Sequence, residues 1–249
     1  MSDWPQGYGK RVLDEVDSTL NEAGRIAPTL SGPEWIMARR QTAARGRRGR
    51  AWVQAQGNLA ATLVMRPVGE AKQAALRSFV AALALFDACV AVTGRAEGLS
   101  LKWPNDVLLN GGKLAGILLE STGHGSGVAH LAIGVGVNLA DAPGADAVEP
   151  GAVRPVSLLS ETGAQVEPEL FLTELAAAFA RYEAQFLTYG FAPIRSAWLA
   201  RAARLGEVIT ARTATSQTVG TFETVDADGN LVLNTAQGRV SIPAAEVYF

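Results

Sequence analysis

The sequence predicts an α+β fold, in which a mixed or antiparallel sheet packs against helices and a small β-barrel follows at the C-terminal end. Apolar residues recur at three- and four-residue steps over 70–92, which indicates a long helix. Two β-rich segments, Val107–Leu109 and Lys113–Glu120, flank an Asn-Gly-Gly turn and indicate a hairpin. Beyond the last helical pattern the chain changes to short strands, so we expect a large domain at 1–204 and a small one at 205–249.

The other elements follow from alternation, helical periodicity and capping residues. The side chains of 17–19 (Asp-Ser-Thr) suit a helix cap, so a short helix over 21–26 should follow the first strand. Pro168 suits the first turn of a helix, and 140–154 is rich in Ala, Pro, Gly and Asp and should be a loop. Strands are expected at Lys10–Val16, Glu34–Ala38, Asn58–Met65, Val128–Leu139, Glu207–Arg212, Thr218–Val225, Asn230–Asn234 and Arg239–Ile242, and a last helix at Pro193–Ala203.

Composition limits the function classes that the chain can serve. Its 249 residues, 48% of them hydrophobic, suffice for one large core or for one core with a small satellite domain. The net charge of −2 argues against a general polyanion-binding surface, and the single cysteine, Cys89, excludes an internal disulfide. No Cys/His spacing suggests zinc, and neither a signal peptide nor a membrane span is visible, so we expect a cytoplasmic protein.

One segment concentrates positive charge. Residues 39–52, the arginine loop, hold six arginines among their first twelve residues and no acidic residue. The guanidinium group matches phosphate and carboxylate oxygens, and the glycines let the backbone come close to a ligand. We therefore expect a loop that gains little by packing on its own protein, is mobile when empty and closes over an anion. The competing interpretation is a solvated basic loop that binds RNA without specificity.

Two segments that contain lysine lie at the predicted hairpin, one directly before it and one at its turn. In 102–106 (Lys-Trp-Pro-Asn-Asp) the Trp-Pro pair fixes the backbone, so Asn105 and Asp106 suit a Mg²⁺–phosphate contact or the orientation of an incoming amine. A turn with an Asx hydrogen bond also explains them. Lys113 follows a Gly-Gly turn and can reach a carboxylate or an α-phosphate, unless it is an ordinary solvent-facing lysine. Strict alternation would put Lys113 and Gly116 on opposite faces, so both serve one site only through a turn or a bulge.

The strand over 128–139 offers a flat face. Its Leu, Ile and Val side chains alternate toward a core, so Gly134, Gly136 and Asn138 face the other side, where backbone can meet a ligand. The glycine spacing does not complete a dinucleotide-binding fingerprint, and neither a P-loop nor a nucleophile elbow is present. Anion-binding groups without an obvious nucleophile favour chemistry driven by charge neutralisation and positioning.

Taken together and in this order, these segments resemble the biotin protein ligases. One such motif is suggestive, whereas five in order over nearly the whole chain are highly specific. The resemblance implies a class II synthetase-like catalytic domain at 1–204 that binds biotin and ATP, and the C-terminal segment is similar to the small end domain of that family. The matching residues are Asp17–Thr19, Gln41, Arg45–Arg50, Trp52, Lys102–Asp106, Gly112–Leu118 and Gly134–Asn138.

The resemblance implies an ATP-dependent, AMP-forming ligase that uses biotin, ATP and Mg²⁺. Biotin and ATP would give biotinyl-5′-AMP and pyrophosphate, and one lysine of a biotin carboxyl carrier domain, in acetyl-CoA carboxylase or a similar protein, would then attack the mixed anhydride. Lys113 and Arg45 would be catalytic, with Lys113 on the carboxylate and the α-phosphate. Biotin would meet Ser18, Thr19, Leu20, Gln41, Arg45, Gly46, Arg47, Lys113, Gly116 and Gly134; the adenylate side would comprise Arg47, Arg48, Arg50, Trp52, Asn105, Gly136 and Asn138; and Asn105 and Asp106 would position a metal or the acceptor lysine.

The sequence departs from the family pattern in three respects. Ala44 stands where glycine is usual, and its methyl group disfavours positive φ, so the geometry of the arginine loop can differ. Leu20 stands where Asn is common, so that polar contact is lost or passes to Asn21. The chain begins a few residues before its first strand, which leaves no room for an N-terminal helix-turn-helix domain, so we expect no specific DNA binding.

Three alternatives stay open at this level. A lipoate or octanoate ligase or transferase on a related fold is the nearest, and 102–106 together with the arginine loop favours biotin. An RNA-binding module would interleave aromatic residues with its basic run, where only Trp52 is present. Lys113 argues against a non-catalytic biotin-binding protein. The oligomeric state is open too, because 128–139 could pair across a two-fold axis in a homodimer or lie inside the sheet.

Overall fold

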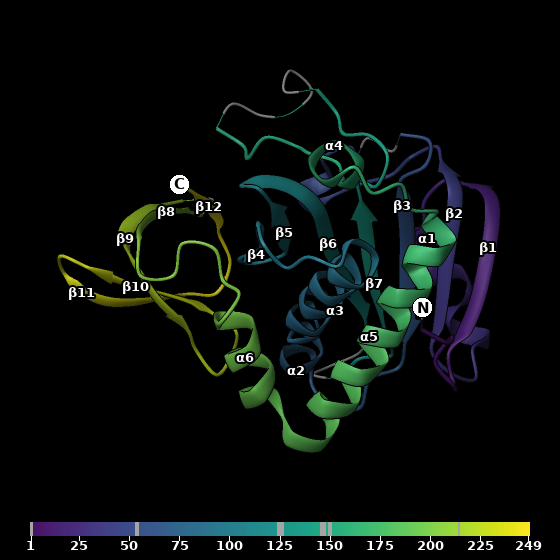
Figure 1. The fold of residues 1–249 in the computed structure, drawn as a ribbon. Coiled ribbons are helices and arrows are strands. Elements are labelled where there is room, and N and C mark those ends of the chain that lie inside the picture. Colours follow the sequence, from purple (N-terminus) through teal and green to yellow (C-terminus); the bar gives the residue numbers. More distant parts are fainter. Residues whose placement is uncertain (1, 53–54, 124–126, 145–147, 149–150, 214) are drawn as a thin grey trace.

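The protein contains a large seven-stranded sheet covered by helices and, beside it, a five-stranded sheet at the C-terminal end (Figure 1). The structure is a computed structural model that describes residues 2–52, 55–123, 127–144, 148, 151–213 and 215–249. The strands of the large sheet are β1 Gly9–Val16, β2 Glu34–Gln41, β3 Leu59–Met65, β4 Leu99–Lys102, β5 Asp106–Leu109, β6 Gly112–Thr122 and β7 His130–Val137, and those of the small sheet are β8 Val208–Arg212, β9 Gln217–Val225, β10 Leu231–Thr235, β11 Gly238–Ile242 and β12 Glu246–Tyr248. The helices are α1 Thr19–Ile26, α2 Ala71–Ala75, α3 Arg77–Thr93, α4 Leu158–Thr162, α5 Pro168–Tyr189 and α6 Phe191–Leu199, with single 3₁₀ turns at Ala27–Thr29 and Arg47–Gly49.

The large sheet is mixed, as the sequence predicts. Its strand order is β1-β2-β3-β7-β6-β5-β4; β1 and β2 run parallel, and every other neighbouring pair is antiparallel. Strand β7 lies between β3 and β6 and is hydrogen-bonded to both. A homodimer that uses 128–139 as an edge strand is therefore ruled out, because no backbone edge of this strand is free to pair.

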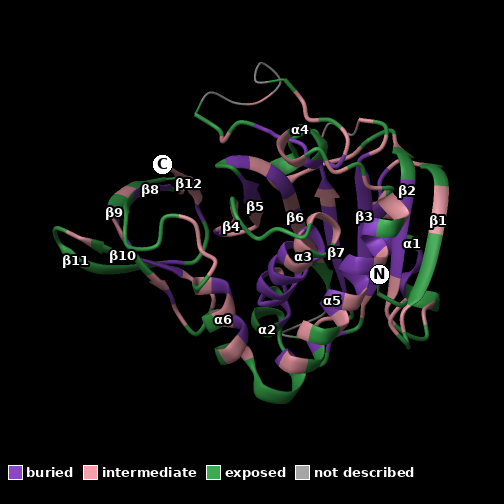
Figure 2. Ribbon diagram, viewed as in Figure 1, coloured by how far each residue is buried: buried purple, intermediate pink, exposed green. Residues whose placement is uncertain are grey.

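The two faces of the large sheet carry different layers. Helices α3 and α5 cover one face, where Trp35 of β2 meets Phe179 of α5 edge to face at a centroid distance of 5.9 Å. The next residue of β2, Ile36, points to the other face because side chains alternate along a strand, and there it packs in a smaller cluster with Leu20 of α1. The main core thus lies between the sheet and α3 and α5, and Figure 2 shows it as buried.

The predicted helix over 70–92 is two helices instead of one. Helix α2 ends at Ala75 and α3 begins at Arg77, because the chain tightens at Leu76, whose carbonyl accepts from the amide of Phe79 in a three-residue turn. The segment Ala71–Thr93 is long and apolar enough to cross a membrane, but 67% of its most apolar window is buried inside the protein, where it forms core. Strands β4 and β12 and helix α4 were not predicted, because three to five residues are too few to show a period.

A five-stranded sheet stands where the sequence predicts a small C-terminal β-barrel. It is antiparallel throughout, in the order β11-β10-β9-β8-β12, so that β11 and β12 form its two edges. It docks on the large domain through the turn before β10: Trp103 Nε1 donates to the carbonyl of Gly229 at 3.0 Å. Gly229 has φ +82° and lies so close to Leu76 and Phe79 that a Cβ atom there would come within 3.0 Å of both. This close contact needs glycine for both its conformation and its size.

Candidate functional site

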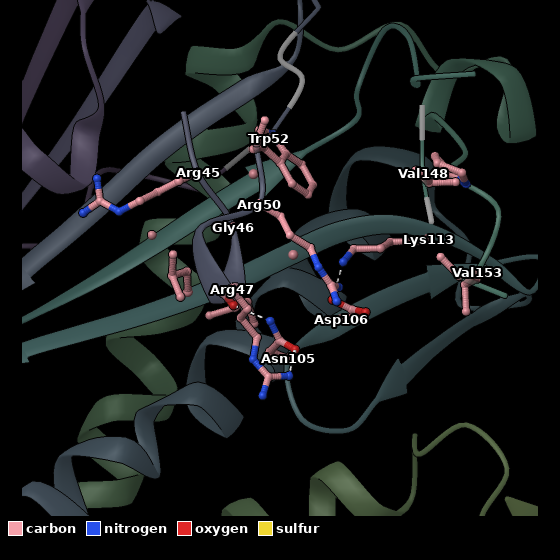
Figure 3. Close-up of a pocket in the computed structure, with 18 of the residues that line it drawn as sticks. Arg45, Gly46, Arg47, Arg50, Trp52, Asn105, Asp106, Lys113, Val148 and Val153 are labelled. Carbon is pink, nitrogen blue, oxygen red and sulfur yellow. Dashed lines mark hydrogen bonds and ion pairs between the residues drawn. The ribbon is translucent and has the colours of Figure 1, made fainter. Parts of the chain in front are cut away.

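A cavity of about 530 Å³ lies on the α1 side of the large sheet (Figure 3). The arginine loop closes one side, strands β5, β6 and β7 form the floor, and the C-terminal strand β12 contributes from the small sheet. The described part of 140–155 supplies a further wall through Val148 and Val153. Segments that are far apart in the sequence therefore meet around one cavity.

The floor of the cavity is made by two glycines of β7, as alternation along that strand predicts. A Cβ atom on Gly134 would lie 2.9 to 3.1 Å from three side-chain atoms of Leu20. One on Gly136 would lie 2.6 Å from Cε2 of the indole of Trp52, and one on Gly116 of β6 would lie 3.3 Å from Cζ3 of the same indole. We call Gly134 and Gly136 the glycine floor. A larger residue at either position would have to displace the side chain that lies above it.

Lys113 and Gly116 face the same cavity, and a β-bulge makes this possible. The register between β5 and β6 shifts so that Val107 pairs with Ala115 while Leu108 pairs with Lys113, which leaves one extra residue on β6. A Cβ atom on Gly116 would lie 3.5 Å from Lys113 Cε. The bulge that the sequence analysis required is therefore present.

Asp106 is the carboxylate at the centre of the cavity, between two lysines. Its Oδ1 lies 2.7 Å from Lys113 Nζ, drawn as a dashed line in Figure 3, and its Oδ2 lies 3.9 Å from Lys102 Nζ. Burial lowers the pKa of Lys102, although the neighbouring Asp106 opposes this change. Lys113 Nζ also lies 5.8 Å from the ring centroid of Trp52, within range of a cation–π contact.

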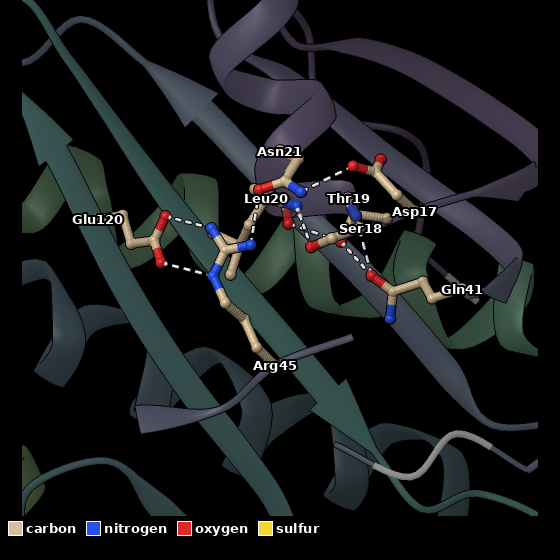
Figure 4. Close-up of polar contacts among 9 residues, drawn as sticks. Asp17, Ser18, Thr19, Leu20, Asn21, Gln41, Arg45 and Glu120 are labelled. Carbon is tan, nitrogen blue, oxygen red and sulfur yellow. Dashed lines mark hydrogen bonds and ion pairs between the residues drawn. The ribbon is translucent and has the colours of Figure 1, made fainter. Parts of the chain in front are cut away.

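The arginine loop is held by carboxylates and amides of its own protein. Arg45 forms two hydrogen bonds to Glu120, at 2.8 and 3.1 Å, and a third to Asn21 at 2.6 Å (Figure 4). Hydrogen bonding to Glu120 raises the pKa of Arg45. Arg50 Nη1 lies 2.8 Å from Glu246 Oε1. The prediction that this loop gains little by packing on its own protein is wrong, because partners 75 and 196 residues away come into reach only in the folded chain.

The remaining arginines of the loop differ in their partners. Arg47 approaches Asn105 Oδ1 at 3.4 Å, and burial lowers its pKa. Arg48 has φ +57°, and its Nη1 lies 3.2 Å from Glu246 Oε2. The first two arginines belong to β2, where Arg40 pairs with Glu15 across the parallel pair β1–β2.

The end of the cavity near α1 is shaped by a helix cap (Figure 4). Ser18 Oγ accepts from the amide of Leu20 at 3.2 Å and begins α1. Gln41 Oε1 accepts from the amide of Thr19 at 2.8 Å, and the Thr19 hydroxyl in turn accepts from Thr62 at 2.8 Å. Ser18, Leu20 and Gln41 line the cavity, whereas the buried Thr19 holds the end of β2 against α1.

Asn138 follows directly after the last residue of β7, next to the glycine floor. Its Nδ2 donates to the carbonyl of Val156 at 3.1 Å, and its Oδ1 is buried and has no hydrogen-bond partner within the described residues. Asn138 lines the cavity as a residue, although its Oδ1 is itself buried.

Most predicted site residues line this one cavity. Of those named from the sequence, Thr19 and Arg48 do not, because Thr19 is enclosed by hydrogen bonds and Arg48 turns toward β12. The Ala44 departure is accommodated, because Ala44 is not among the described residues with positive φ. Four further residues line the cavity but received no site role from the sequence: Lys102, Glu246, Val247 and Tyr248. The motif at 102–106 could have pointed to Lys102, whereas the three residues at the C-terminal end belong to no motif.

Comparisons with known proteins match both parts of the chain. Residues 9–138 match the model of the Biotin/lipoate A/B protein ligase family, and residues 205–249 match the Biotin protein ligase C terminal domain. The chain is 62% identical to the biotin--[acetyl-CoA-carboxylase] ligase of Paracoccus denitrificans, over 96% of this chain and 99% of that protein. It is 34% identical to the bifunctional ligase/repressor BirA of Escherichia coli, over 77% of this chain and 59% of that protein.

Solved structures share the fold. The biotin protein ligase from Aquifex aeolicus in complex with biotin and ATP superposes with a TM-score of 0.79 at 24% identity, over 96% of this chain and 97% of that one. The biotin protein ligase from Leishmania major in complex with biotinyl-5-AMP gives a TM-score of 0.68 at 20% identity, over 96% of this chain and 100% of that one. These likenesses confirm the α+β fold with its small C-terminal β domain.

Proposed function

We propose a function from the premise that this chain belongs to the Biotin/lipoate A/B protein ligase family. The protein is an ATP-dependent biotin–protein ligase: it joins biotin to ATP as biotinyl-5′-AMP and transfers the biotinyl group to a lysine of a biotin carboxyl carrier domain, such as that of acetyl-CoA carboxylase. The observation that carries the proposal is a lysine, Lys113, beside a glycine floor and a loop of arginines in one cavity, in a chain 62% identical to a relative of that name.

In the first step a carboxylate oxygen of biotin attacks the α-phosphorus of ATP. This carboxylate oxygen forms a bond to the α-phosphorus while the bond from the α-phosphorus to pyrophosphate breaks. Negative charge therefore grows on the α-phosphate and on the pyrophosphate that leaves. Lys113 can meet that charge if its ammonium group turns from Asp106, 2.7 Å away, toward the phosphate. Arg45, Arg47 and Arg50 line the same cavity and can neutralise the other oxygens.

In the second step the amine of the acceptor lysine attacks the carbonyl carbon of the mixed anhydride. An amide bond forms, the bond to AMP breaks, and the amine loses a proton. Asp106 and Asn105 line the cavity beside Lys113 and are our candidates for orienting that amine. The biotin ring is assigned to the end formed by Ser18 and Gln41, and the adenylate to the end with Trp52.

Mg²⁺ fits this site as the counterion of ATP and not as an ion held by a protein cluster. No group of three or more His, Cys, Asp or Glu residues that could hold a metal occurs in the part of the chain that the structure describes. Asp106 is already paired with two lysines, and Asn105 Nδ2 donates to the carbonyl of Ile117 at 2.6 Å. Mg²⁺ usually keeps several waters and binds through substrate phosphates, which agrees with this donor set.

Several finer points belong to the proposal. We place the protein in the cytoplasm, without specific DNA binding and without a membrane contact, and we divide it into a catalytic domain at 1–204 and a C-terminal domain at 205–249. The two family matches, at 9–138 and 205–249, support this division. A homodimer of this protein would have to form through surfaces other than an edge of β7.

The test is biotin-dependent exchange of labelled pyrophosphate into ATP, with Lys113→Ala beside the unmodified protein. We expect exchange that requires biotin and falls about 10²–10³-fold in the variant, because the charge that meets the developing oxyanion is lost. Lys72→Ala is the matched control, since Lys72 is exposed and lies 3.7 Å from Asp228, outside the cavity. Exchange with lipoate instead of biotin would assign the chain to lipoate chemistry, and unchanged exchange in Lys113→Ala would remove this lysine from the mechanism.

A further inference from the structure

One carboxylate of the small sheet reaches the arginine loop. Glu246 begins β12, and its side chain is 16% exposed. Its Oε1 lies 2.8 Å from Arg50 Nη1 and its Oε2 lies 3.2 Å from Arg48 Nη1. The hydroxyl of Tyr248 donates to Oε2 at 2.8 Å. A single side chain therefore holds two neighbouring arginines and is itself fixed by a third group.

The ionised form of Glu246 is favoured in this setting. Burial opposes ionisation, but hydrogen bonds from Arg50 and Tyr248 outweigh it, so that the pKa of Glu246 lies below its usual range. The negative charge also offsets the repulsion among the arginines of one short loop. The carboxylate is thus a stable partner for the loop near neutral pH.

The loop conformation that Glu246 holds is a costly one. Arg48 adopts φ +57° without being a glycine, a backbone state that L-residues rarely occupy. Within the loop, the amide of Gly46 donates to the carbonyl of Arg50 at 2.7 Å, and Arg45 and Ala51 form an isolated bridge. Contacts from outside the loop must offset the strain at Arg48, and the ion pair to Glu246 is such a contact.

The small sheet is a firm support for this contact. Trp103, in the same segment as Asn105 and Asp106, donates to the carbonyl of Gly229, and Arg195 of α6 donates to the carbonyl of Val225. Strand β12 is hydrogen-bonded to β8 within that docked sheet. A side chain presented by β12 is therefore fixed relative to the floor of the cavity.

We propose that Glu246 is a positioning residue for the ATP end of the cavity, which holds Arg48 and Arg50 in the closed arrangement before the nucleotide arrives. This inference rests on the proposed function. Arg50 lines the cavity, so its orientation decides whether a phosphate finds a preformed partner or must first order the loop. Biotin, assigned to the far end near Ser18, gains nothing from this contact.

The experiment compares Glu246→Gln with the unmodified protein in two measurements. Steady-state biotinylation of a carrier domain should show the KM for ATP raised about three- to tenfold, with the KM for biotin and kcat at saturating ATP little changed, as expected from losing two partly exposed ion pairs. Hydrogen exchange without ligands should be faster at residues 45–50. Glu246→Asp, which keeps the charge, should restore part of both effects.

Glu223→Gln is the matched control. Glu223 lies on the same sheet and pairs with Arg239 at 2.9 Å, outside the cavity, so its removal should leave the KM for ATP and the exchange of 45–50 unchanged. A fall in the KM for ATP in Glu246→Gln would overturn the proposal and show that the carboxylate competes with phosphate. Equal exchange of 45–50 in both proteins would also overturn it, and this measurement stands even if the unmodified protein shows no ligase activity, which would refute the proposed function instead.

Discussion

The two sides of the cavity are stabilised by different forces. The glycine floor is apolar and tightly packed: Leu20 is 7% exposed and lies against Gly134, and the indole of Trp52 lies against Gly136. The arginine loop is held by ion pairs whose side chains are 30 to 45% exposed on the arginine side. Packing is rigid and specific, whereas partly exposed ion pairs are weak and exchangeable. The ion pairs of the loop are therefore easier to break than the packing of the floor.

The largest effect on stability is expected from Gly134→Ala. A Cβ atom at this position would lie 2.9 to 3.1 Å from three side-chain atoms of Leu20, which is buried in the cluster between α1 and the sheet. Overpacking of this kind costs about 1–3 kcal/mol of the free energy of unfolding, which denaturant titration measures. Gly24→Ala on α1 is the control, because nothing lies within 4 Å of its Cβ position. Equal stability of the two variants would show that the floor is loosely packed.

Gly136→Ala should weaken the binding of ATP with little effect on the stability of the protein. Its Cβ atom would lie 2.6 Å from Trp52, which is only half-buried and is the last residue of the arginine loop, so the indole can shift without disturbing the core. We expect the KM for ATP to rise by roughly tenfold and the free energy of unfolding to change by less than about 1 kcal/mol. A loss of stability as large as that of Gly134→Ala would contradict the difference between the two sides.

Acid should open the arginine loop before it affects the floor. The pKa of Glu246 is lowered in the folded protein, so its contribution is present above the ordinary glutamate pKa, about 4.3, and is lost as the pH falls through the lower folded value. Arg48, Arg50 and Tyr248 face this carboxylate. Tryptophan fluorescence from pH 7 to pH 3, compared with Trp52→Phe, should report the change, and the same acid step in Glu246→Gln would refute this cause.

The smallest effect is expected from Glu120→Gln. The Arg45–Glu120 pair measures 2.8 Å, but the two side chains are 30% and 42% exposed, so the solvent screens it. We expect a loss of less than about 1 kcal/mol in the free energy of unfolding. A larger loss by denaturant titration would mean that the loop is anchored as firmly as the floor.

The fold and the floor were accessible from sequence because their signals are local. Alternation along 130–137 predicts which residues face the core, and Gly134 and Gly136 accordingly face the cavity. The Asn-Gly-Gly turn predicts the β5–β6 hairpin, and Gly111 there has φ +76°. In contrast, the break at Leu76 leaves no trace in the apolar period, because buried apolar residues continue on both sides of it, at Ala74 and Phe79.

The partners of the charged residues were not accessible in the same way. The arginine loop shows what charge it carries, but not that Glu120 and Glu246 approach it, because any carboxylate in the chain could serve equally well on charge alone. The β-bulge on β6 likewise depends on the register between β5 and β6. Strict alternation indicated only that Lys113 and Gly116 need a turn or a bulge to face one site.

The sequence by itself determined the α+β class, most of the strands along the chain and the residues that can bind an anion, because side-chain period, turn chemistry and charge are properties of short segments. Only the tertiary structure decided that β7 is internal, that Lys113 and Gly116 share one face, and that β12 supplies Glu246 to the cavity. These outcomes depend on strand register and on domain docking, which are settled by how separate elements meet and leave no local pattern.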